Sequence, residues 1–270
     1  MAFERAKAAL AGTRFADLQW VAETGSTNAD MVELLREAGP AARPLVLVAD
    51  HQTAGRGRLD RTWEAPPGSS ILMSVGLPLD QYPEDRWSLL TGALGGAATE
   101  ALEGLRLKWP NDLVAVGAGP DGTDRKVGGI LAELHDVPGV GHCAVLGLGA
   151  NLNWPAVPEH LADIATSMNL LLGGAVDAEV VLTDLLVALD ERWLPLIERS
   201  APSTGEFHAA WAARSATLGR RVRVELPDAV LVGTAVDLAP DGALVVEDDQ
   251  AVRRTVRAGD VVHLRPEPAE

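Results

Sequence analysis

Apolar and polar positions follow two different patterns along the chain. Up to about residue 216, continuous apolar runs alternate with segments in which apolar residues recur at helical spacing. From Leu218 onward the segments are short and alternate apolar with polar residues, as the strands of a small sheet do. We therefore expect a larger domain that mixes helices and strands over residues 1–216, and a small β-barrel over residues 217–270.

The apolar runs of the first part are bounded by proline, glycine or charged residues, which predicts buried strands. They cover residues 44–50, 69–77, 105–110, 126–134 and 143–152. The last three runs are spaced as hairpins, and the polar segment GAGPDGTD, which lies between the runs 105–110 and 126–134, should be a mobile loop.

Helical patterns separate these strands. The first 20 residues should hold one short helix and little more. Thr27 to Asp30 have the T-x-x-D form of a capping box, so a helix should begin there and end at Gly39. Helical periodicity continues at 87–105, where Gly95, Gly96 and Ala97 offer a small packing face, and at 180–197 and 204–214.

The second part should consist of strands alone. Its alternating segments cover residues 221–226, 231–238, 243–248, 253–258 and 261–265. Asp241-Gly242 is a hairpin turn signal between two of them. Strands this short and this close together are typical of a small barrel.

The composition is that of an ordinary soluble protein, with 47% hydrophobic and 23% charged residues among 270. A net charge of -15 argues against a nucleic-acid or anionic-membrane partner, because both need a positive surface. The chain shows no apolar stretch of membrane-spanning length and no secretion signal, so we expect a cytoplasmic protein. Any site for an anion must therefore be local.

The cysteine and histidine residues give no indication of a disulfide or a metal site. Cys143 is the only cysteine, which excludes an intrachain disulfide and a cysteine zinc site, and its apolar surroundings predict a buried small hydrophobe. The six histidines form no HExxH motif and no close pair.

The segment from His51 to Trp63, HQTAGRGRLDRTW, concentrates positive charge in this acidic chain. Its arginines are suited to carboxylate and phosphate because a guanidinium donates bidentate hydrogen bonds. Gly55 and Gly57 allow backbone N–H groups to approach a ligand and the loop to change shape. On its own this segment could also be a solvated surface turn, so its interpretation depends on the rest of the chain.

Three further segments also offer polar groups or space to a small ligand. GSTN (25–28) presents hydroxyls and an amide at a helix start, and LKWPND (107–112) places polar side chains at a strand end interrupted by Pro110. RKVGGI (125–130) and GLGANLN (147–153) carry glycines on two strands. Because glycine has no side chain, these positions could leave space for a ligand against the sheet. Each glycine could instead mark a β-bulge, and Thr27 could be only a helix cap.

Other ligand motifs are absent. GRGRLD has Asp60 where the dinucleotide fingerprint requires its third glycine, and the chain contains neither a Walker A G-K pair nor a G-x-S-x-G elbow.

Taken together and in this order, the segments resemble the catalytic core of biotin protein ligases over nearly the whole chain. The matching strings are STN, GRGRxxRxW, KWPND, RKxGGIL and GxGxNLN. The resemblance implies an α+β fold related to class II aminoacyl-tRNA synthetases, with a mixed, largely antiparallel sheet, helices and a small C-terminal β-barrel. It also implies that biotin and ATP form biotinyl-AMP and pyrophosphate, after which a lysine of a biotin carboxyl carrier protein receives the biotinyl group.

The resemblance also assigns residues to the two substrates. For biotin it implies Ser26, Thr27, Asn28, Gln52, Arg56, Gly57, Arg58, Lys126, Gly129 and Gly149, with Gly128 helping to form the slot. For ATP it implies Arg58, Arg61, Trp63, Lys108, Asn111, Asp112 and Asn151.

The catalytic residues would be Lys126, Arg56 and Arg58, because the biotin carboxylate and the α-phosphate repel each other unless cations neutralise them. Asp112 would hold Mg²⁺, which prefers one or two carboxylates together with phosphate oxygens, although it could also be a turn residue. Trp109 is more simply explained as a core aromatic residue, an explanation that also applies to Trp63.

Several alternatives remain. A lipoate ligase or octanoyltransferase has the same fold, and the complete GRGRxxRxW loop favours biotin over it. A biotin-responsive DNA-binding repressor is opposed by the short N-terminal segment and the acidic charge. A protein that binds biotin without catalysis would release no pyrophosphate. One departure from the family pattern is the long, glycine-rich stretch between Asp112 and Lys126, which could shift the entry of the carrier lysine.

Overall fold

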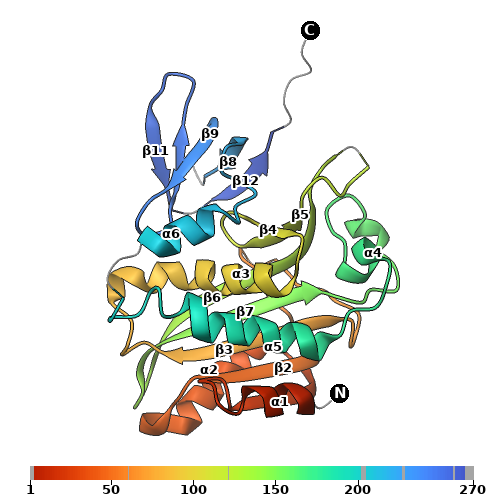
Figure 1. The fold of residues 1–270 in the computed structure, drawn as a ribbon, viewed down its shortest axis with the longest axis vertical. Coiled ribbons are helices and arrows are strands. Elements are labelled where there is room, and N and C mark those ends of the chain that lie inside the picture. The colour runs from red at the N-terminus through yellow and green to blue at the C-terminus, as the bar shows by residue number, and fades with distance from the viewer. Residues whose placement is uncertain are drawn as a thin grey trace.

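A seven-stranded sheet forms the centre of the computed structural model, which describes residues 3–59, 61–120, 122–201, 205–226, 229–257 and 259–264 (Figure 1). The strand order is β1-β2-β3-β7-β6-β5-β4. β1 pairs with β2 in parallel, and the other neighbours pair antiparallel. The strands are β1 (Leu18–Thr24), β2 (Leu45–Gln52), β3 (Ser70–Pro78), β4 (Leu105–Lys108), β5 (Asp112–Ala115), β6 (Arg125–Val137) and β7 (Gly141–Asn151).

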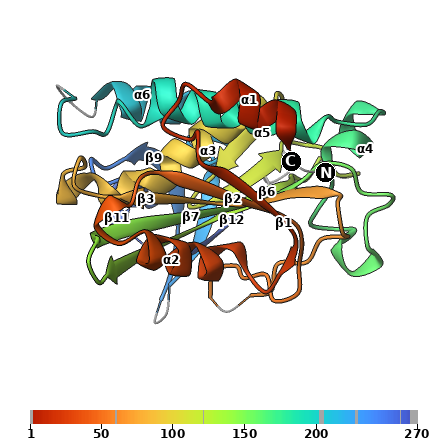
Figure 2. The same ribbon diagram turned by 90° about the horizontal axis from the view of Figure 1, so that it is seen from below.

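Helices cover both faces of this sheet. Figure 2 shows α2 (Thr27–Ala38) on one face and α1 (Glu4–Leu10), α3 (Leu90–Ala101) and α5 (Ala178–Ala188) on the other. The remaining helices are α4 (Met168–Leu172), α6 (Gly205–Ala212), a π-helical turn (Leu189–Trp193) and 3-10 turns at Gly39–Ala41, Glu84–Leu89 and Glu159–Leu161. None of the helices in the described ranges is both long and apolar enough to cross a membrane.

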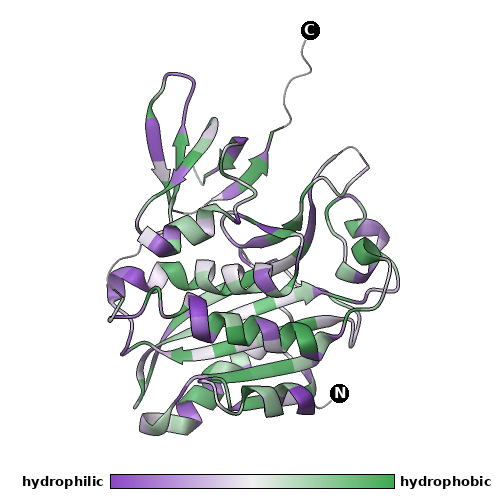
Figure 3. Cartoon of the chain, in the orientation of Figure 1, coloured by the Kyte–Doolittle hydropathy of each residue, from purple (hydrophilic) through white to green (hydrophobic). Residues whose placement is uncertain are grey.

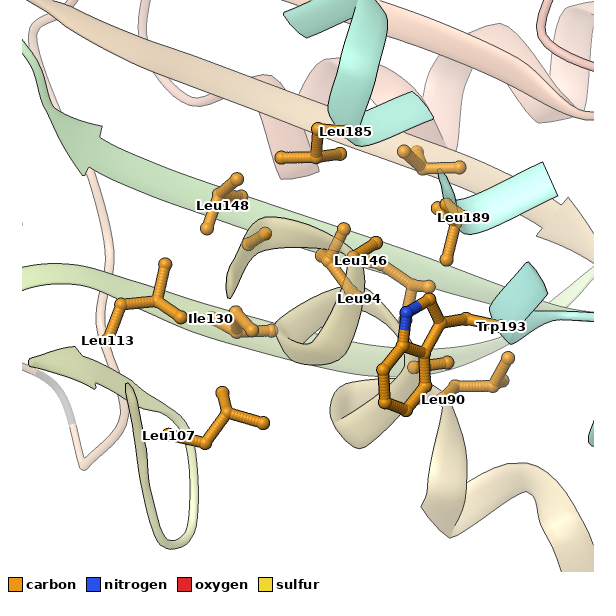
Figure 4. Close-up of a cluster of buried hydrophobic side chains, with 14 of the residues drawn as sticks. Leu90, Leu94, Leu107, Leu113, Ile130, Leu146, Leu148, Leu185, Leu189 and Trp193 are labelled. Carbon is orange, nitrogen blue, oxygen red and sulfur yellow. The ribbon is translucent and has the colours of Figure 1, made fainter. Parts of the chain in front are cut away.

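The continuous apolar run of β2 is explained by burial on both faces of the sheet. Val46 and Val48 belong to the large core under α3 and α5, whereas Leu45 and Leu47 pack with Met31 of α2 in a smaller core. Figure 4 shows the centre of the large core, where Leu94, Leu146, Leu185 and Trp193 come together. Figure 3 shows hydrophobic colouring along much of the sheet and hydrophilic colouring on β11.

Two sequence expectations about packing are confirmed. A methyl group at Gly95 would overlap Leu107, and one at Gly96 would overlap Trp193, so the small face of α3 lies directly against its neighbours. Cys143 is fully buried on β7, and this burial raises the pKa of its thiol, as expected of an inert small hydrophobe.

The C-terminal strands form a second sheet in the order β11-β10-β9-β8-β12. They are β8 (Arg221–Glu225), β9 (Val230–Leu238), β10 (Leu244–Glu247), β11 (Arg253–Val256) and β12 (Asp260–His263), and Gly242, at φ 78°, lies in the predicted hairpin turn. No pairing joins β11 to β12 within the described residues, so the sheet is antiparallel as expected but a closed barrel is not shown. Ala258 and Arg265, the ends of two predicted strands, lie outside the described residues.

Several predicted boundaries were wrong. The pattern missed β1, which lies within and beyond the first 20 residues. The helix predicted at 87–105 ends at Ala101, because Gly104 turns the chain with φ 89° into β4. The runs 105–110 and 126–134 do not pair directly, since β5 lies between β4 and β6. Thr204, the predicted start of the helix 204–214, and Asp121 of the predicted loop lie outside the described residues.

The capping box at Thr27 was also wrong. Ser26 is the N-cap residue of α2 and makes no side-chain capping bond, while Thr27 is already helical. The Thr27 hydroxyl donates instead to Gln52 Oε1, and the Asp30 carboxylate accepts from Thr24. The start of α2 is therefore tied to neighbouring strands, which directs its side chains toward the site described next.

Candidate active site

A cavity of about 750 Å³ opens where the start of α2, the end of β2, the first half of β6, the last part of β7, and β12 meet. Its wall includes every residue that the family resemblance assigned to a substrate except Gly128. These are Ser26, Thr27, Asn28, Gln52, Arg56, Gly57, Arg58, Arg61, Trp63, Lys108, Asn111, Asp112, Lys126, Gly129, Gly149 and Asn151. The structure thus brings together segments that are far apart in the sequence, as the four motifs predicted.

One end of the cavity is a fixed network of small polar side chains. The Gln52 amide oxygen accepts from the Thr27 backbone N–H at 2.7 Å and from its hydroxyl at 3.0 Å. The hydroxyl of Ser74, on β3, donates to Asn28 Oδ1 at 2.6 Å and lies 2.8 Å from the Thr27 hydroxyl. Thr27 and Asn28 are almost fully buried, so these groups are held in place for a polar ligand.

The floor of the cavity is the glycine-rich part of β6 and β7. Alternation along β7 directs Leu146 and Leu148 into the core, which leaves Gly147 and Gly149 on the face toward α2 and the arginine loop, residues 55–63. A side chain at Gly147 would overlap Asn28, and one at Gly149 would overlap the Trp63 indole. Gly128, expected in the same slot, instead faces Leu113 and does not line the cavity.

The arginine loop folds over this floor as a small closed turn. The Gly57 N–H donates to Arg61 O at 2.7 Å, and the Trp63 N–H donates to Gly55 O at 2.9 Å. Leu59 lies at its tip with φ 54° and a 68% exposed side chain. Asp60, which excluded the dinucleotide fingerprint, lies outside the described residues.

Each arginine of the loop has a partner on a different element. Arg56 donates to Glu133 on β6 at 3.1 Å, Arg58 donates to Asn111 Oδ1 at 3.2 Å, and Arg61 forms an ion pair with Asp260 on β12. Since Arg56 and Arg61 are more than half exposed, their ion pairs contribute little stability. An anionic ligand that offers several oxygens could therefore replace these partners.

Lys126 lines the cavity beside Asp112 and Trp63. Its Nζ lies 2.6 Å from Asp112 Oδ1 and 5.4 Å from the centre of the Trp63 ring. The pairing across β5 and β6 explains why Lys126 and Asp112 face the same space. A positive amine beside a carboxylate and an indole face could accept a second anion with little rearrangement.

The two asparagines and Trp109 are buried to different degrees. Asn111 is half-buried and donates to Ile130 O at 2.6 Å. Asn151 is buried and donates to Thr166 O at 3.1 Å, while its Oδ1 has no partner within the described chain and is available to a donor on a ligand. Trp109 is a core residue, as expected, and its indole N–H donates to Gly242 O at 3.1 Å.

Sequence reasoning missed the residues that reach the site from distant segments. Glu133 holds Arg56 and Asn28, Asp260 holds Arg61, and Asp124 lines the cavity two residues before Lys126. The segment His160–Ala165 also contributes to the wall. No local motif marks these positions, because their importance comes from long-range contacts.

The described residues contain no group of three or more His, Cys, Asp or Glu side chains that could hold a metal ion. Asp112 is paired with Lys126, and the other carboxylates of the cavity wall form no cluster of three or more potential ligands with it among the described residues. This donor set suits a divalent ion that arrives with phosphate oxygens and does not suit a resident structural metal.

Comparison with known proteins gives the same assignment. Residues 22–151 match the Biotin/lipoate A/B protein ligase family, and residues 217–264 match the Biotin protein ligase C terminal domain. The biotin-(acetyl-CoA-carboxylase) ligase of Mycobacterium tuberculosis is 39% identical over 94% of this chain and 92% of its own length. A Paracoccus denitrificans protein of the same name is 33% identical over 89% of this chain and 98% of its own length.

The fold has a counterpart among solved structures. The biotin protein ligase from Aquifex aeolicus, in complex with biotin and ATP, has a TM-score of 0.75 and 27% identity over 93% of this chain and 100% of that chain. Fold and cavity thus define a ligase of the biotin and lipoate class. Within that class, the chain belongs to the biotin protein ligase family.

Proposed function

We propose that this protein activates biotin with ATP to biotinyl-AMP and then transfers the biotinyl group to a lysine of a biotin carboxyl carrier protein. The observation that carries the proposal is the single cavity that joins a glycine-floored slot to Lys126 and the arginine loop. The chain's extensive similarity to a biotin-(acetyl-CoA-carboxylase) ligase supports the acceptor.

The first step joins two anions. A biotin carboxylate oxygen attacks the α-phosphorus of ATP, a P–O bond to the β-phosphate breaks, and pyrophosphate leaves. Lys126 and Arg58 reduce the repulsion between these groups and stabilise the negative charge of the transition state. In the second step the lysine amine attacks the acyl carbon, AMP leaves, and the nitrogen loses a proton as the amide forms.

The residues divide between the two substrates along the cavity. Ser26, Thr27, Asn28 and Gln52 provide hydrogen bonds to the ureido ring, and Gly129 and Gly149 leave room for the apolar body of biotin. Arg56 and Gly57 cover it, while Arg58, Arg61 and Lys108 bind phosphates. Trp63, Asn111 and Asn151 contact the nucleotide, and Asp112 would hold a Mg²⁺ that screens the phosphate charge.

The proposal extends to the organisation of the chain. Residues 1–216 form the catalytic domain and residues 217–270 a C-terminal domain. The net charge of -15 supports a partner that is a protein and not a nucleic acid. We place the reaction in the cytoplasm.

Transfer to a carrier domain tests the function. Purified protein, biotin, ATP and Mg²⁺ are incubated with an unmodified biotin carboxyl carrier domain, and intact mass spectrometry follows the carrier. We expect one added biotinyl group, none without ATP, and none on a carrier whose acceptor lysine is replaced by arginine. Lipoate in place of biotin should give no product. Modification by lipoate alone would indicate a lipoate ligase of the same fold.

We also expect biotin and ATP to protect the arginine loop from hydrogen exchange. The exposed ion pairs of Arg56 and Arg61 hold the empty loop weakly, so ligand anions should add stability there. Amide exchange of residues 55–63 with both ligands should be slower than without them, and the strands of the C-terminal sheet far from the cavity provide the internal reference. Equal exchange in both states would show that this loop is not ordered by the substrates.

A further inference from the structure

His263, near the end of the described chain, is held at both ring nitrogens in a buried contact between the two sheets. It lies on β12, and its side chain is only 10% exposed. Its Nδ1 is 2.9 Å from Asp124 Oδ2, and its Nε2 is 3.1 Å from the Thr217 hydroxyl. No sequence motif and no substrate assignment includes this residue.

Two partners of His263, Thr217 and Asp124, are connected to segments of the cavity wall. Thr217 is fully buried, and its hydroxyl oxygen accepts from the Trp109 backbone N–H at 3.0 Å. Trp109 lies between Lys108 and Asn111, which both line the cavity. Asp124 lies two residues before Lys126, and it also accepts from the Gly117 N–H at 3.1 Å, which closes the loop between β5 and β6.

The ring nitrogens of His263 face partners of both kinds. Nδ1 lies 2.9 Å from Asp124 Oδ2, an acceptor, and 3.1 Å from Arg220 Nη1, a donor. The Thr217 hydroxyl can donate to Nε2 or accept from it, since its oxygen keeps a second lone pair beside the bond from Trp109. These contacts fit a neutral imidazole in either tautomer.

The electrostatics of the cluster agree with a neutral ring. Burial lowers the pKa of His263, and the nearby charges of Lys108 and Arg220 lower it further, against the opposing effect of Asp124. Burial acts to raise the pKa of the Asp124 carboxyl, but hydrogen bonds from His263 and Gly117 and the charge of Arg220 outweigh it and lower this pKa. Arg220 Nη1 lies 2.8 Å from Asp124 Oδ2 and 3.1 Å from His263 Nδ1, so this guanidinium contacts both members of the pair.

We propose that His263 is a positioning residue for the nucleotide end of the cavity. Through Thr217 it fixes the turn that carries Lys108, Asn111 and Asp112, and through Asp124 it fixes the start of β6 that carries Lys126. The C-terminal sheet thereby sets the distance between two groups of residues that must bind the same triphosphate. This inference rests on the proposed function, because it takes the nucleotide to be ATP.

The effect should be confined to one end of the cavity. The network of Thr27, Asn28 and Gln52 is built from α2, β2 and β3 and has no described contact with His263. His263→Ala should therefore raise the Kd and KM for ATP about tenfold, the typical consequence of losing one buried hydrogen-bond partner. The Kd for biotin should stay within about twofold of the wild-type value.

The experiment compares matched variants by calorimetric binding of ATP and biotin and by pyrophosphate release. His142→Ala, an exposed histidine at the far end of β7, is the control and should change neither Kd. Thr217→Val should reproduce the ATP defect, Thr217→Ser should restore near wild-type affinity, and the double variant with His263→Ala should be no worse than either single variant.

The outcomes separate the two proposals. An unchanged ATP Kd in folded His263→Ala and Thr217→Val, or an equal loss of ATP and biotin affinity, overturns the positioning role. If His263→Ala does not fold, the Thr217 pair decides. A wild-type protein that binds ATP but makes no biotinyl-AMP contradicts the proposed function, while the ratio of Kd values still tests His263.

Discussion

Replacing Lys126 with alanine should reduce the rate of pyrophosphate release at least about 100-fold, which corresponds to roughly 3 kcal/mol of lost transition-state stabilisation. The amine faces the cavity beside Asp112 and Trp63, where we propose that the carboxylate of biotin and the α-phosphate meet. Without it, two anions would approach each other next to a third, uncompensated carboxylate. Pyrophosphate release with saturating biotin and ATP measures the effect.

The fold should tolerate this change. Lys126 and Asp112 keep 36% and 25% of their side chains exposed, so water can solvate the carboxylate that remains. The chain has only one lysine outside the cavity, Lys7, which makes Lys7→Ala a matched control with an expected wild-type rate. A Lys126→Ala protein that melts normally and releases pyrophosphate within tenfold of wild type would require another residue in this role.

The sequence was sufficient to predict the helices and strands with strong periodicity, but it was insufficient to predict where they begin and end. β2 and α5 were found because their apolar residues face a core on one or both sides. β1 was missed because only Leu18 of its residues is buried, so its short LQWVAET pattern does not stand out. Its place at the edge of the sheet depends on parallel pairing with β2, which local sequence does not encode.

The site was predictable for a related reason. The residues that the resemblance assigned to the substrates lie in compact motifs, and each of those motifs lines the cavity. The residues that hold these motifs in place lie far away in sequence: Arg56 and Glu133 are 77 positions apart, and Asp124 and His263 are 139 positions apart. Such contacts exist only after the sheets have formed.

Thr27 illustrates how one pattern can have two explanations. Its T-x-x-D spacing matched a capping box, but in the folded chain a helix start with free backbone donors lies against β2 and β3. The Gln52 amide accepts from the Thr27 backbone N–H, which is a donor that a cap would otherwise satisfy. Tertiary contacts thus replaced the local cap and, in doing so, built one end of the cavity.

We expect the Arg58→Gly protein to release the intermediate, biotinyl-AMP, before the carrier arrives. Arg58 is half-buried and reaches Asn111 across the cavity, so its guanidinium lies where a phosphate joined to biotin would be held. Removing it eliminates a charge-assisted hydrogen bond of roughly 1.5 to 3 kcal/mol and adds a third glycine to the loop. Losing a contact to a bound ligand acts mainly on its off-rate, so release should be about 10- to 100-fold faster while some adenylate is still made.

Free biotinyl-AMP is a reactive acyl phosphate, so it should acylate lysines on proteins that the enzyme does not recognise. A streptavidin blot of albumin incubated with the Arg58→Gly protein, biotin and ATP should show labelling that wild type does not produce. Arg43→Gly provides the matched control, because Arg43 is exposed and lies outside the cavity. If pyrophosphate release is retained and albumin stays unlabelled, Arg58 does not hold the intermediate. Closure over the adenylate would then have to depend on Arg56 and Arg61, whose partners lie on β6 and on the C-terminal sheet.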